Sequence, residues 1–100
     1  MYIGTITKKA TDHRKYTIRW TEYLTNAGGD EFDMEDFTVI PDEVGGVKIG
    51  TAEFAPHDNG DGTIDFWITG GNYGTSYVVA NKATLQSGRI ETKELRIYIV

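Results

Sequence analysis

The sequence predicts an all-β protein, and three observations carry this prediction. Helical periodicity at i, i+3 and i+4 does not persist over any long window. Short runs of alternating apolar and polar residues recur instead, and clusters of Gly, Asn and Asp separate them. About seven such runs in a chain of 100 residues are typical of an antiparallel β-sandwich. A chain of this length supplies one hydrophobic core, so residues 1–100 are expected to form a single domain.

The first half of the sequence contains two predicted strands on either side of an acidic segment. In the strand that ends at Trp20, Tyr16, Ile18 and Trp20 share one face, which places Trp20 in the core. The acidic segment 25–36 has two adjacent glycines and almost no apolar residues, so it is predicted to be a long loop up to residue 35. A short strand over residues 37–40 follows and ends before a proline.

The second half contains four more predicted strands. A strand over residues 47–55 keeps its apolar side chains inward only if a bulge lies near Gly50. In the last strand the inward parity changes after Ile90, so a second bulge is expected between Thr92 and Glu94. Turn residues separate the three final strands, which are predicted over residues 63–69, 75–85 and 89–100.

The run Gly74-Thr75-Ser76-Tyr77-Val78-Val79 resembles the entry to strand F of fibronectin type III and immunoglobulin-like domains. The resemblance implies that Tyr77 is a corner tyrosine, whose ring is buried while its hydroxyl group bonds nearby backbone. The Ile18-x-Trp20 pair resembles the early strand whose tryptophan fills the middle of such sandwiches. The structural core is therefore expected to include Trp20, Tyr77 and Gly74.

A longer resemblance covers nearly the whole chain. Residues 16–20, the acidic segment and the strand after it are similar to a family of small bacteriophage proteins known as fibre-tail adaptor or virion-associated proteins. The second half resembles the family more closely, through Phe66-Trp67-Ile68-Thr69-Gly70-Gly71, the Gly-Thr-x-Tyr run, Gly88-Arg89 and the closing aliphatic strand. This resemblance implies a structural protein of the virion, made in the cytoplasm of a bacterial host, that contacts other phage structural proteins.

Charge is distributed unevenly along the chain. The net charge is −5, which argues against nucleic acid as the main partner. Residues 1–20 carry five basic side chains and one acidic one, whereas residues 21–43 carry eight acidic side chains and no basic one. This asymmetry makes self-association a possibility to test. No apolar run is long enough for a membrane helix, and the N-terminal residues do not follow the signal-peptide pattern.

No pattern for catalysis or for an obligatory cofactor emerges from the sequence. The segment 58–65 invites comparison with a calcium loop, but the ligand register of an EF-hand fails, so an ordinary turn is expected. The chain has no cysteine, its two histidines are expected at the surface, and neither serine lies on a nucleophile elbow. We therefore expect no enzymatic activity, no cofactor and no metal site.

Two aromatic residues are candidate interface residues. Because Ile64, Phe66 and Ile68 are expected to face the core, Trp67 is expected to point outward, where tryptophans are enriched at interfaces. Tyr98 has the outward parity of the last strand and is a candidate to join it. The alternative function is a carbohydrate- or cell-surface-binding module, in which the two rings stack on sugars.

Overall fold

The computed structural model describes residues 2–100. Strands dominate this part of the chain, which confirms the all-β prediction. In chain order, the elements are β1 (Tyr2–Lys8), β2 (Arg14–Arg19), α1 (Thr21–Asn26), β3 (Phe32–Ile40), β4 (Lys48–Ile49), the 3-10 helix η1 (Ala52–Phe54), β5 (His57–Asp58), β6 (Thr63–Thr69), β7 (Ser76–Leu85) and β8 (Ile90–Ile99).

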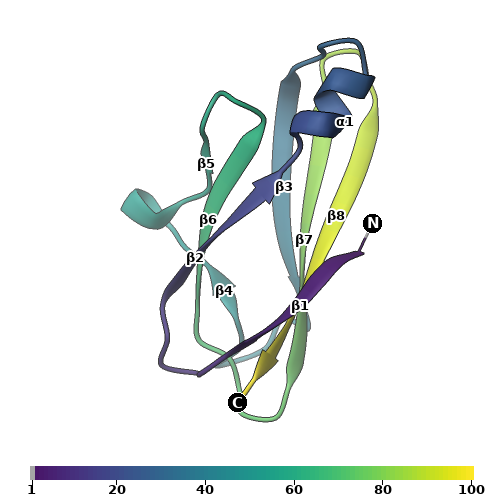
Figure 1. The fold of residues 1–100 in the computed structure, drawn as a ribbon. Helices are drawn as coiled ribbons and strands as arrows, with labels where there is room; N and C mark the ends of the chain where they lie inside the picture. The colour runs from purple at the N-terminus through teal and green to yellow at the C-terminus, as the bar shows by residue number, and fades with distance from the viewer. Residues whose placement is uncertain (1) are drawn as a thin grey trace.

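The strands form two sheets, which Figure 1 shows on the right and left of the molecule. The larger sheet has the order β1-β8-β7-β3. The smaller has the order β2-β6-β4, and β5 pairs with the remaining length of β6. We call them the large sheet and the small sheet.

The prediction of a purely antiparallel arrangement is wrong, because β1 pairs with β8 in parallel, with Ile6 opposite Ile97. The physical reason is the connection after β1. The chain crosses there from the large sheet to the small sheet instead of returning as a hairpin, so no tight turn imposes antiparallel pairing on β1.

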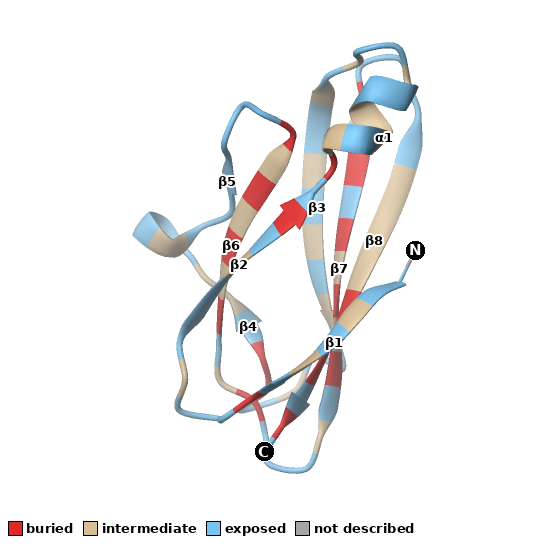
Figure 2. Cartoon of the chain, in the orientation of Figure 1, coloured by how far each residue is buried: buried red, intermediate tan, exposed pale blue. Residues whose placement is uncertain are grey.

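The core lies between the two sheets and follows from the alternation of side chains along each strand. In Figure 2 buried residues alternate with more exposed ones along β6 and β7. Ile64, Phe66 and Ile68 are buried from the small sheet, as the period of two predicted. They pack in one cluster with residues of the large sheet, among them Val79 and Ile97.

The acidic segment 25–36 is not a long loop. Helix α1 occupies its start, and β3 begins at Phe32, five residues earlier than predicted. Tyr23 and Phe32 pack their rings against Trp20, with centroids 5.5 and 6.3 Å away, so residues of both α1 and β3 contact the core. The acidic residues are tolerated within β3 because it is an edge strand with an outward face.

Neither predicted bulge forms. β4 has only two residues, and after Gly50 the chain leaves the sheet to form η1, so no continuous strand needs a change of parity there. The pairing of β8 with β7 is unbroken from Tyr98 to Ile90, without a bulge between Thr92 and Glu94. Ile90 simply faces outward and is 58% exposed.

Candidate partner-binding surfaces

Trp20 is one of the largest side chains of the core. The side chain is fully buried, and its Nε1 donates a hydrogen bond to Oδ1 of the buried Asn81 at 2.8 Å. The ammonium group of Lys93 lies 4.7 Å from the centre of the ring and donates to the backbone carbonyl of Arg19. Burial lowers the pKa of Lys93. This end of the sandwich is thus closed by an aromatic ring with polar partners.

Tyr77 has the geometry of a corner tyrosine. Its ring is fully buried, and its hydroxyl group accepts a hydrogen bond from the backbone N–H of Asn72 at 2.9 Å. The same hydroxyl donates to Oε1 of Glu43 at 2.5 Å, and this bond is the main reason that the pKa of Glu43 is lowered. Gly74 does not belong to the core, contrary to the prediction, because it is exposed in the turn before β7 with φ +77°. Its role is to allow that backbone conformation.

Trp67 points away from the core, on the outer face of the small sheet, and is partly covered. The ring of Phe54 from η1 packs edge-on against it at 5.2 Å between centroids. The ring of His13, from the β1–β2 connection, lies 4.7 Å from it and 4.6 Å from Phe54. The three rings form a compact outer cluster that fixes η1 to the sheet. Trp67 therefore presents only part of its ring to a partner.

Tyr98 lies on the outer face of the large sheet and is 41% exposed. Thr7 and Ser76 flank it on the neighbouring strands, and both are exposed. Because Trp67 belongs to the outer face of the other sheet, the structure does not bring the two candidate residues together. Each would have to contact a partner separately.

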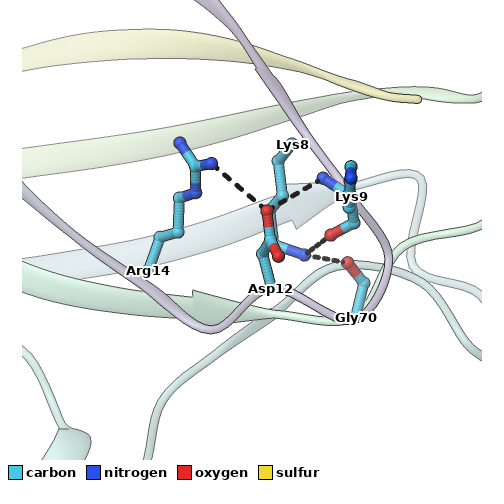
Figure 3. A network of polar contacts seen from close by, with 5 residues as sticks. All are labelled: Lys8, Lys9, Asp12, Arg14 and Gly70. Carbon is cyan, nitrogen blue, oxygen red and sulfur yellow. Dashed lines mark hydrogen bonds and ion pairs between the residues drawn. The ribbon is translucent and has the colours of Figure 1, made fainter.

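The basic residues near the start of the chain are largely engaged within the molecule (Figure 3). Lys8 is buried, and its Nζ donates to the backbone carbonyls of Lys9 at 2.7 Å and of Gly70 at 2.6 Å. Burial lowers the pKa of Lys8. Asp12 pairs with Arg14 at 3.2 Å. The bond from Lys8 to Gly70 ties the end of β1 to the loop after β6, and the pair of Asp12 with Arg14 lies within the β1–β2 connection and the start of β2.

A short connection between β5 and β6 replaces the calcium-loop pattern that the sequence invited for comparison. Oδ1 of Asp58 accepts from the backbone N–H of Gly60 at 2.8 Å. Oδ1 of Asp61 accepts from the backbone N–H and the hydroxyl group of Thr63, which lowers the pKa of Asp61. Over residues 2–100, no group of three or more His, Cys, Asp or Glu side chains is placed to hold a metal ion. None of the helices there is long and apolar enough to cross a membrane.

The sequence did not predict that the two sheets leave one side of the molecule open. Three cavities of about 510, 380 and 330 Å³ follow β3 there, and residues of β4, β5 and β6 line their opposite wall. We call this the side groove. Glu35 points into it, because it shares inward parity with Phe37 and Val39. This inward parity is visible in the sequence and could have identified Glu35 as a residue between the sheets.

Glu35 has an unusual environment in the side groove. Its Oε1 is shielded from solvent and has no hydrogen-bond partner. The pKa of Glu35 is raised to about 7, mainly by burial and also by the negative charge of Asp58, and a hydrogen bond with Asn81 offsets only part of this rise. A carboxylate at this position is therefore under-compensated when ionised.

Comparison with known proteins gives one family match. A search of curated proteins found no match. The family model described as Gp77, podophage GP4 fiber-tail adaptor protein gp77, matches residues 8–98. The match spans the chain from the end of β1 almost to the end of β8, and so includes both sheets. The chain belongs to this family of podophage fiber-tail adaptor proteins.

Proposed function

We propose that this protein works without catalysis, as a contact-making component that joins other structural proteins of a phage tail. The single observation that carries the proposal is the family match over residues 8–98. A fiber-tail adaptor is a virion-associated structural protein that associates with other tail proteins, and the family is not an enzyme class. Synthesis in the cytoplasm of the bacterial host is part of the same proposal.

Several physical features support contacts with proteins rather than with nucleic acid or sugars. The net charge of −5 disfavours phosphate backbones. The outer faces of the sheets carry Tyr98 and the partly exposed Trp67. For the alternative of carbohydrate binding, stacking on a sugar needs a free ring face, but Phe54 and His13 occupy part of the Trp67 ring. We therefore favour protein partners.

We also propose that residues 1–100 form one immunoglobulin-like domain of the fibronectin type III kind. Two facing sheets around one core support this, as does the double hydrogen bonding of the Tyr77 hydroxyl group. The parallel pairing of β1 with β8 and the number of strands are departures from the simple seven-strand antiparallel scheme.

The test is incorporation into virions. Purified particles of the phage that encodes this chain should contain it, and Tyr98→Ala and Trp67→Ala should each reduce the amount incorporated. Tyr73→Ala is the matched control, because it removes an aromatic ring that is 84% exposed in the loop before β7 and outside both sheet faces. Thermal melts of the isolated variants separate lost contact from lost folding. Absence of the chain from purified particles would refute the proposal.

A further inference from the structure

The side groove consists of three cavities that follow one another along β3. Asp58 lines both the largest cavity, below α1, and the next one, beside Glu35. The third cavity continues along β3 at Thr38 and Val39 and ends at β4. The groove thus follows β3 for most of its length, with a wall from each sheet.

The rim of the side groove is an unpaired strand edge. Within residues 2–100, β3 pairs with β7 on one side and with no strand on the other. It is nine residues long. An edge strand of this length presents backbone N–H and C=O groups to which an additional strand can bond. Side chains of an added strand would point alternately into the groove and toward the outer face of the large sheet.

The side groove is strongly acidic. The one basic residue among those that line it, Lys48, is already bonded to Asp42 at 2.8 Å. Glu35 stands at its centre, with the shielded and unpartnered Oε1. Leu24 and Phe32 supply apolar surface that the stem of a lysine or arginine side chain could cover. The carboxylates that line the groove are those of Asp30, Glu31, Glu35, Asp36, Asp42, Asp58 and Asp61.

We propose that the side groove binds an extended basic segment of another protein, which adds as a strand to the free edge of β3 and directs alternate Lys or Arg side chains toward Glu35 and Asp58. The backbone bonds supply affinity and the alternate cations supply selectivity. The inference rests on the proposed function only in taking the ligand to be a protein.

A second copy of this chain is the less suitable occupant. Its own basic edge strand is β2, but Arg14 is paired with Asp12, and Nζ of Lys15 lies 3.9 Å from a carboxylate oxygen of Asp65. A segment from another protein brings cations that are not already paired. Self-association through the side groove is thus an outcome that would overturn the proposal.

The experiment uses the full chain and a nine-residue probe peptide of alternating Lys and Val, with an alternating Glu and Val peptide as its counterpart. Binding is measured by fluorescence anisotropy at pH 8, above the pKa of Glu35, and amide shifts are followed by NMR. The basic peptide should bind, shift the amides of β3 most strongly, and lose affinity as salt rises. N-methylation of its alternate backbone nitrogens should abolish binding, since added-strand bonds would be lost.

Glu35→Gln should weaken binding of the basic peptide roughly three- to tenfold. Glu94→Gln is the matched control and should leave the affinity unchanged. It removes the same charge from the outer face of β8, away from the side groove. Equal binding of both peptides, amide shifts confined to β1 or β2, or tolerance of N-methylation would overturn the proposal. So would a dimer, seen by light scattering without peptide, that Glu35→Gln dissociates.

These outcomes are distinct from those of the virion test. If the chain is incorporated into particles but the probe peptide does not bind, the proposed function stands and the side groove is not its contact. If the peptide binds but the chain is absent from particles, the groove is a peptide site in a protein of different function.

Discussion

Replacement of Glu35 by glutamine should raise the free energy of unfolding above that of wild type at pH 8. At pH 5 the two proteins should have nearly the same free energy of unfolding. The carboxyl group points between the sheets, next to Asp58, and its Oε1 has no hydrogen-bond partner. In the folded state its pKa is raised to about 7 from an ordinary value of 4.5. Protonated Glu35 therefore contributes stability that is fully present below pH 4.5 and is lost as pH rises to about 7.

The size of this effect follows from the shift in pKa. At about 1.4 kcal/mol per pH unit, the shift sets an upper limit of roughly 3 kcal/mol. Because the side chain is only partly buried, solvent screening reduces the expected value to about 1–2 kcal/mol. Glutamine keeps the shape of the side chain but cannot ionise. The variant therefore does not lose stability as pH rises, whereas wild type does. In a chain of 100 residues the corresponding change in melting temperature is about 5–10 °C.

The assay is urea unfolding of wild type and Glu35→Gln at pH 5, 6, 7 and 8, followed by tryptophan fluorescence. The difference in free energy of unfolding should grow in favour of the variant across this range. Glu94→Gln separates this effect from the general loss of one negative charge. A difference that stays constant from pH 5 to pH 8 would refute the assignment of Glu35 as a buried, under-compensated carboxylate. Acidic groups with lowered pKa values act in the opposite direction, and their stabilisation is lost only at lower pH: Asp42, Glu43, Asp61 and Asp65.

Three further substitutions test the core. Trp20→Ala should reduce the free energy of unfolding by about 3–5 kcal/mol in a urea melt, because it opens a cavity and leaves Asn81 without its indole partner; a loss below about 1 kcal/mol would contradict the burial of the ring. Tyr77→Phe should lose about 1–3 kcal/mol in the same assay, since the N–H group that its hydroxyl group satisfies loses its partner, and unchanged stability would show that water replaces the hydroxyl group. Gly71→Ala should lower the melting temperature by several degrees, because φ is +118° and a Cβ atom would overlap Ile99; an unchanged melt would mean that the neighbouring backbone shifts without strain.

Much of the strand pattern could be predicted from local sequence. β6 occupies residues 63–69 as predicted, because a strand with one buried face must alternate, and Ile64, Phe66 and Ile68 do so without interruption. The outward direction of Trp67 follows from the same period of two, whereas the buried ring of Tyr77 was implied by the resemblance of residues 74–79 to a known strand entry. Where local signals were ambiguous, the prediction was wrong. The acidic segment was predicted to be a loop because its charged residues suggested that all of its side chains are exposed. An edge strand, however, needs apolar residues on only one face.

By itself, the sequence determined the class of fold and the inward and outward faces of the long strands, because each of these depends on residues close together in the chain. The family resemblance also came from the sequence, through motifs along nearly its whole length. Only the tertiary structure decided the parallel pairing of β1 with β8, the separation of Trp67 from Tyr98 and the side groove. Each of these depends on which distant segments lie side by side. Glu35 and Asp58 belong to different sheets and lie 23 positions apart in the chain, yet they line the same cavity. Periodicity places each side chain on a face of its own strand, but it carries no information about which strand lies opposite.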